Sequence, residues 1–157
     1  MSRSSAARRT LRTARLLTWR DWWSVFEATV WLALARVAIL TIRFPELSRR
    51  LGVHMQETTH DDDVRHRPTL ARIRWAIAAV SRRAPWRCMC LEQAVAAKMM
   101  LRRRGIEQTL YLGVAREPDS TAVKAHAWLR CGSYYVTGGE GRDAYTVVST
   151  FAEERRA

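Results

Sequence analysis

Two residues of this chain have the types and the setting that thiol chemistry requires. Cys90 opens an apolar helical pattern that ends at Gly105, and His126 lies in an alternating, strand-like segment from Val123 to Leu129. Unpaired N–H groups and the dipole at the first turn of a helix favour a thiolate, which is the nucleophilic form of cysteine. A nearby imidazole can take the thiol proton. The pair therefore indicates a thiol hydrolase or acyl-transfer site.

Each member of this pair also fits a structural role. Cys90 alone could be a small buried apolar residue, and a single strand histidine is more often a packed or exposed side chain. The other two thiols fit the nucleophile less well, because Cys88 falls in the loop before the helical pattern and Cys131 falls at a turn.

A cysteine–histidine site also benefits from a polar group that fixes the tautomer of the ring. Glu140 and Asp143 are the acids on or after the strand that follows His126. Glu140 lies in a glycine-rich bend, where the backbone can come close, so we predict Glu140 as the orienting residue and keep Asp143 as the alternative. A solvated turn glutamate is the structural alternative for Glu140.

The sequence favours no metal and no cofactor. Cys88 and Cys90 are separated by one residue, which is too few for a zinc pair, and no second pair follows. His54, His60 and His66 lie near the acidic run at 61–63, but their spacings match no tight site, so we predict a solvated loop over 54–67. A phosphate-binding glycine loop is also missing from the sequence.

The order of the patterns predicts an α+β fold, with helices first and then a few antiparallel strands. Core-facing residues recur at helical spacing between Pro68 and about Arg83, and again from Cys90 to Gly105. Strands are predicted at 106–114, 123–129, 134–137 and 144–151. We expect the cysteine-bearing helix to pack on this small sheet.

The N-terminal part of the sequence consists of a basic segment followed by an apolar one. Residues 1–18 are predicted to be a basic tail, and the stretch from Trp22 to about Arg43 is predicted to be a helix. Charges interrupt that stretch, so we interpret it first as a buried or partner-covered helix. The second interpretation is a helix that lies on an anionic membrane surface.

The segments around the two candidate residues resemble a known family. Cys90–Ala94, Leu101–Ile106, Leu112–Val114 and Ala125–Leu129 resemble the lasso-peptide biosynthesis B protein, in its stand-alone leader-peptidase form, within the transglutaminase-like superfamily. The resemblance spans about residues 68–142. It implies a papain- or transglutaminase-like fold, Cys90 as nucleophile and His126 as base. The acid that this family usually carries shortly after the histidine strand is replaced here by Gly132 and Ser133.

The resemblance also implies a function and partners. A cysteine peptidase of this kind removes the leader peptide from a ribosomally made lasso precursor, which a separate recognition protein holds and a separate cyclase later closes. On this basis we expect a helical region and polar loop at 19–67 and a peptidase domain at 68–157. The apolar Trp22 helix is a candidate docking face.

The net charge suggests an alternative function, and the cysteine content suggests a cellular compartment. The net charge of +12 favours anionic partners, so a non-enzymatic nucleic-acid-binding or membrane-surface protein is the alternative. No nucleic-acid-binding motif is recognisable, so we expect no such partner. Three cysteines and the lack of an apolar signal segment at the start lead us to expect free thiols and a cytoplasmic protein.

Overall fold

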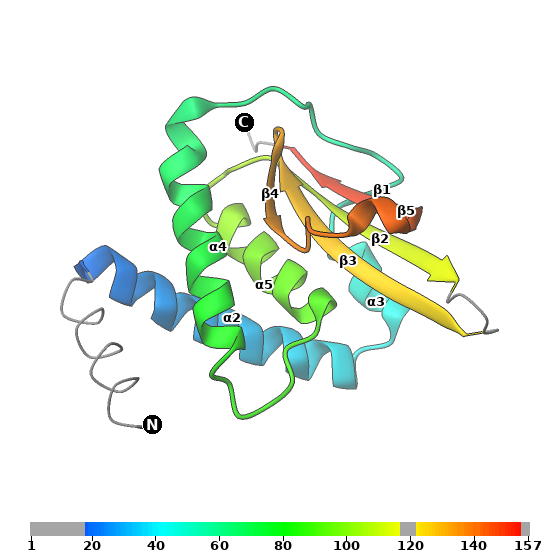
Figure 1. Ribbon diagram of the computed structural model, residues 1–157, viewed down its shortest axis with the longest axis horizontal. Helices are drawn as coiled ribbons and strands as arrows, with labels where there is room; N and C mark the ends of the chain where they lie inside the picture. Colours follow the sequence, from blue (N-terminus) through cyan, green and yellow to red (C-terminus); the bar gives the residue numbers. More distant parts are fainter. Residues whose placement is uncertain (1–17, 117–121, 155–157) are drawn as a thin grey trace, which may run out of the picture.

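The structure is a computed structural model that describes residues 18–116 and 122–154. The predicted basic tail falls almost entirely outside these residues. Among the described residues, helical segments precede the main strands (Figure 1). They are α2 (Trp19–Thr41), α3 (Phe44–Arg49), η1 (Val64–His66), α4 (Arg67–Ser81) and α5 (Cys90–Arg102), with the short strand β1 (Val53–His54) after α3.

The second half of the chain forms an antiparallel sheet. Its strands are β2 (Gln108–Arg116), β3 (Val123–Cys131), β4 (Tyr134–Thr137) and β5 (Thr146–Glu153), with a short helix η2 (Arg142–Ala144) before β5. Their order across the sheet is β1-β5-β2-β3-β4. The structure thus confirms the predicted α+β fold, with the cysteine-bearing helix packed on the sheet.

Helix α5 occupies the centre of the domain. It contacts α2 and α4 on one side and β2, β3 and β4 on the other (Figure 1). Its alanines at 94, 96 and 97 are fully buried, because small side chains let neighbouring backbones approach closely. Met100 and Leu101 complete the same core. The start of this helix is therefore held from several directions.

Helix α2 was first interpreted as a buried or partner-covered helix, and the domain itself buries it only in part. Only one side of it is buried, through residues such as Ala28, Leu32 and Ala35 that pack in the same core as α4 and α5. The opposite side is apolar and exposed. This difference arises because apolar residues occupy two faces of α2, and the domain covers one of them.

The polar segment that precedes α4 has a structural role. Asp62 accepts hydrogen bonds from the backbone and the hydroxyl of Ser133, both at 2.7 Å, which ties the segment to the β3–β4 turn. These bonds, with Arg67, lower the pKa of Asp62 to about 2. Asp63 accepts from the backbone N–H of Arg65 and begins η1. Within the described residues, no group of three or more histidine, cysteine or acidic side chains is arranged to hold a metal ion.

Candidate active site

Cys90 is the first residue of α5, where the helix leaves its unpaired N–H groups. The preceding residue, Met89, has extended backbone angles (φ −76°, ψ 169°) and is the N-cap. The side-chain amide of Gln93, in the first turn, donates a hydrogen bond of 2.9 Å to the Cys88 carbonyl. This bond holds the loop before α5 against the helix. The Cys90 side chain is half-buried. This setting places a thiol where the helix dipole favours negative charge.

The surroundings of the other two cysteines disfavour the thiolate form. Burial raises the pKa of the Cys88 thiol, and the negative charge of Glu92 raises it further. Burial raises the pKa of Cys131 on β3 to about 11. A raised pKa lowers the fraction of thiolate, which is the nucleophilic form of cysteine. Cys90 stays the predicted nucleophile.

His126 lies on β3 with its ring held by three neighbours. Its Nε2 is 2.8 Å from the carbonyl oxygen of Gly138. The ring lies 4.9 Å from the Tyr145 ring and 5.7 Å from the Trp128 ring, centroid to centroid. Because a carbonyl can only accept, Nε2 carries the hydrogen and the neutral ring keeps its lone pair on Nδ1. Nδ1 is therefore the nitrogen available as a base.

The backbone carbonyl of Gly138 makes the contact with the His126 ring that was predicted for Glu140. The Glu140 side chain is 95% exposed and forms an ion pair with Arg74 at 3.4 Å. Asp143, the alternative, is 84% exposed and pairs with Arg142. In the structure neither carboxylate contacts the His126 ring. Both face solvent because the bend after β4 turns its backbone, and not its side chains, toward the ring.

Gly138 can make this contact only because it has no side chain. Its φ of +65° is a left-handed conformation, and a Cβ there would lie 2.4 Å from the carbonyl oxygen of Ala127. The glycine pair at 138 and 139 was the available signal in the sequence. This pair indicates a tight bend, but it does not indicate which side chain donates a hydrogen bond to the Gly138 carbonyl.

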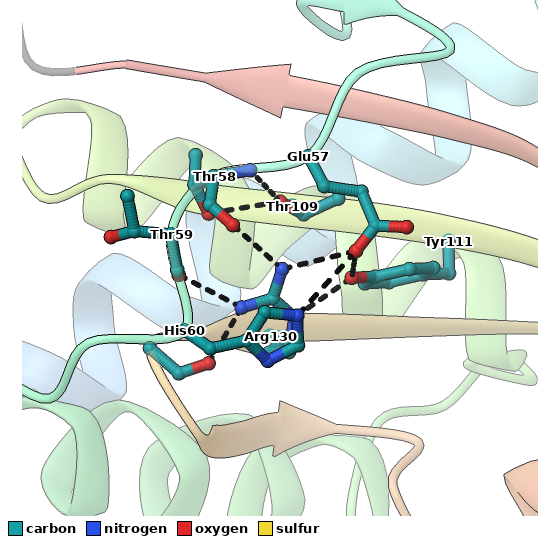
Figure 2. Close-up of polar contacts among 8 residues, drawn as sticks. Glu57, Thr58, Thr59, His60, Thr109, Tyr111 and Arg130 are labelled. Carbon is teal, nitrogen blue, oxygen red and sulfur yellow. Dashed lines mark hydrogen bonds and ion pairs between the residues drawn. The ribbon is translucent and has the colours of Figure 1, made fainter.

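A second group of residues, absent from the predicted site, surrounds Arg130 of β3 (Figure 2). Alternation along β3 places Arg130 on the same face of the sheet as His126. Arg130, fully buried, donates to the Tyr111 hydroxyl at 2.8 Å and to the carbonyls of Thr58 and Thr59. The Tyr111 hydroxyl donates in turn to Glu57. Burial, together with this bond, raises the pKa of Tyr111 to about 12. These hydrogen bonds hold the loop at 57–59 against the sheet.

This network reaches His126 through stacked rings. The Tyr111 ring stacks on Trp128 at 5.4 Å with 3° between the planes, and Trp128 stacks on His126. Gly113 pairs with His126 across β2 and β3, and a Cβ at Gly113 would meet the Trp128 ring at 2.8 Å. The imidazole is thus fixed from its own strand and from the strand beside it.

The two candidate residues approach the sheet from different sides. Alternation along β3 puts His126 with Trp128, whereas Ala127 and Leu129 share the core with α5. In the described part of the chain, the Cys90 thiol makes no hydrogen bond to the His126 ring. Strand β4 pairs only with Leu129–Cys131, so the edge of β3 beside His126 is not covered by β4.

A cavity lies near the start of α5, although neither Cys90 nor His126 belongs to its lining. It has a volume of about 200 Å³ and lies between α4, the first turn of α5 and the bend after β4. Its lining includes Gln93, one turn after Cys90, and Gly138, whose carbonyl holds His126. A larger cavity of about 560 Å³ lies beside Cys131 and the acidic run at 61–63, and its lining includes neither candidate residue.

Comparison with known proteins gives one match. A family model described as Transglutaminase-like superfamily matches residues 31–150. No curated protein and no solved structure gives a significant match. The matched range begins within α2 and contains α5, β3 and the bend that carries Gly138.

Proposed function

Because the chain belongs to the transglutaminase-like superfamily, whose members are often cysteine-dependent enzymes, we propose that it is a cysteine peptidase that removes the leader peptide from a ribosomally made lasso precursor. The observation that carries the proposal is the setting of its two candidate residues. A thiol opens the central helix, and an imidazole on the adjoining strand has its Nε2–H bound to a fixed carbonyl. The lasso precursor as substrate rests on the motifs around Cys90 and His126.

The proposed reaction starts with a proton transfer. Nδ1 of His126 takes the proton of the Cys90 thiol, and the Gly138 carbonyl, bound to Nε2–H, stabilises the imidazolium that forms. This resembles the part that a carboxylate plays in other cysteine–histidine sites, with a neutral acceptor in place of a charged one. The thiolate and the imidazolium then form the reactive pair.

Acylation follows at the junction between leader and core. The Cys90 sulfur attacks the scissile carbonyl carbon, and the electron pair of that carbonyl moves to its oxygen. Backbone N–H groups in the first turn of α5 are the available donors for this oxyanion. The intermediate collapses to a thioester on Cys90 as the C–N bond breaks, and the His126 imidazolium gives its proton to the departing amine.

Hydrolysis of the thioester completes the cycle. His126 takes a proton from water, the resulting hydroxide attacks the thioester carbonyl, and the Cys90 sulfur leaves with the proton returned by His126. The leader is released as a carboxylic acid. The free thiol and the neutral imidazole are restored.

The reaction requires a hydrogen bond between the Cys90 thiol and the His126 ring, which the described residues do not form. Catalytic hydrogen bonds are often long or poorly aligned until the Michaelis complex forms. The cavity lined by Gln93 and Gly138 is where we place the substrate, because it adjoins the start of α5 and the loop that holds the imidazole. We propose that the occupied cavity draws the two groups together at the uncovered edge of β3.

The proposal includes partners and a compartment. A separate recognition protein would hold the leader, and a separate cyclase would receive the core peptide. The three cysteines are free thiols in the structure, which suits a reducing cytoplasm.

A reconstituted cleavage assay tests the proposal. The precursor, the recognition protein and this chain are incubated together, and the products are weighed by mass spectrometry. We expect separate leader and core peptides, no cleavage by Cys90→Ala, and normal cleavage by the matched control Cys88→Ala. Cleavage by Cys90→Ala at the wild-type rate would refute the proposed chemistry.

A further inference from the structure

The outer side of α2 carries a continuous apolar stripe. Its members recur every three or four residues, which places them on one side of a helix. Every one of them is exposed, from 38% at Val30 to 79% at Trp19. The outer stripe consists of Trp19, Trp22, Trp23, Phe26, Val30, Leu34, Val37 and Leu40. At 1.5 Å per residue it is about 30 Å long.

A stripe of this size marks an interaction surface rather than ordinary surface composition. We propose that the outer stripe of α2 binds the surface of an anionic lipid membrane, with the helix lying in the plane of the interface. The proposal goes beyond the peptidase activity and does not depend on it.

The charges around α2 complement an anionic surface. The two acidic residues of α2 are both paired with arginines outside α2: Asp21 with Arg72 of α4 at 3.2 Å, and Glu27 with Arg103 and Arg104, just after α5, at 3.1 and 2.6 Å. They therefore present little negative charge to lipid. The repulsion that anionic headgroups would exert on unpaired carboxylates is removed.

Positive charge meanwhile borders the stripe at both ends. Arg20 and Arg43 are exposed, one in the first turn of α2 and the other just after its last. The sequence that leads into α2 contains arginines at positions 3, 8, 9, 12 and 15 and no acidic residue. Each basic residue near an anionic bilayer adds attraction that weakens with salt.

The composition of the stripe also suits an interface. Three tryptophans and a phenylalanine lie at its N-terminal end, and these residue types favour the boundary between headgroups and acyl chains. The stripe is a convex ridge without a polar side chain among its eight members. A flat, fluid surface fits such a ridge without the polar contacts that a specific protein partner would need.

The same helix passes a test for spanning a membrane by length and composition. It has 23 residues with a mean hydropathy of 1.5 in its most apolar window. Packing in the domain argues against insertion, because its inner side carries the buried, ion-paired Glu27 and shares the core with α4 and α5. Spanning would expose these groups to lipid, so we place α2 on the membrane and not across it.

Vesicle flotation of the full chain tests the proposal. We use vesicles of phosphatidylcholine alone and of phosphatidylcholine mixed with phosphatidylglycerol. We expect the wild-type chain to float with the anionic vesicles and to remain below the neutral ones, and added salt to weaken the binding. Failure of the wild-type chain to float with anionic vesicles would overturn the proposal.

Two matched variants assign the binding to the stripe. Phe26→Glu and Val64→Glu each place one acid at an exposed apolar position, at 59% and 75% exposure. Only Phe26 lies on α2. We expect Phe26→Glu to lower partitioning about tenfold or more, and Val64→Glu to bind like the wild type. Leu34→Glu serves as a second stripe variant if Phe26→Glu lowers the melting temperature.

Other occupants of the stripe give distinct outcomes. A wild-type dimer that Phe26→Glu converts to a monomer, without flotation of either, would show a second copy on the stripe and overturn the proposal. Normal flotation of Phe26→Glu with loss of binding to the recognition protein would also overturn it. Cys90→Ala should float like the wild type, so failure of the peptidase assay leaves this test unaffected.

Discussion

Nε2 of His126 lies 2.8 Å from the carbonyl oxygen of Gly138, a residue with a left-handed φ of +65°. This contact fixes the ring so that Nδ1 remains as the base. It also explains how a site without a nearby carboxylate can hold its imidazole. The Gly138 contact is made by its backbone carbonyl. A substitution that moves this part of the backbone can nevertheless test its positioning role.

Gly138→Ala should disturb the ring more than an equivalent change elsewhere in the bend. Its Cβ would meet the Ala127 carbonyl at 2.4 Å, so the loop must shift, at a cost of about 1–3 kcal/mol. We expect the cleavage rate to fall at least tenfold, since displaced catalytic groups lose orientation. Nitrogen-15 NMR of His126 should show a smaller share of the Nε2–H tautomer.

Gly141→Ala is the matched control for this change. Gly141 has a similar φ of +71°, but a Cβ there has no neighbour within 4 Å. It should lose about 1 kcal/mol of stability from backbone strain and keep the wild-type tautomer. An unchanged tautomer in Gly138→Ala would refute the positioning role.

Arg130→Leu should destabilise the fold. The guanidinium is buried and donates to the carbonyls of Thr58 and Thr59 and to the Tyr111 hydroxyl, so its loss removes these hydrogen bonds from the network. We expect a loss of about 2–4 kcal/mol in the free energy of unfolding, measured by urea denaturation. Arg65→Leu removes an exposed ion pair with Asp63 and should leave stability nearly unchanged. Equal effects of the two variants would contradict the role of the network.

The buried Lys98 should make stability depend on pH. Burial lowers its pKa from 10.5 to about 8, although Glu153 lies 3.3 Å away. Between these values the unfolded state binds the proton and the folded state does not, so this residue makes stability rise with pH. The gain is about 3 kcal/mol from pH 8 to 10.5.

The comparison with Lys98→Met isolates this effect. Cys131 and Tyr111 have raised pKa values and make stability fall over an overlapping range, so the wild-type curve alone mixes opposite trends. The difference in unfolding free energy between wild type and Lys98→Met removes their common contribution. That difference should rise in favour of the wild type as the pH increases, and a flat difference would show that Lys98 titrates normally.

Local patterns predicted the elements but not the contacts between them. Alternation around His126 and helical spacing after Cys90 gave β3 and α5 close to their observed bounds. Strand β1 was missed because its two residues are defined only by pairing with β5. The sequence around Arg130 likewise contains no sign of Glu57, which lies 73 residues away.

The candidate site shows the same division. Cys90 could be preferred over Cys88 and Cys131 because its position in a helical pattern is a local feature. The partner of the His126 ring could not be predicted, since any residue supplies a carbonyl and only the backbone path decides which one arrives. An acid was the natural expectation for that role, and the bend after β4 sends Glu140 to Arg74 instead.

The most direct test of the central claim is a double-mutant cycle on precursor cleavage with Cys90→Ala, His126→Ala and the combined variant. If the two residues act as one unit, each single change should lower kcat/KM by about a thousandfold or more, and the combined variant should be no slower than either. A single variant that keeps activity within about tenfold of wild type, or losses that multiply in the combined variant, would contradict the account.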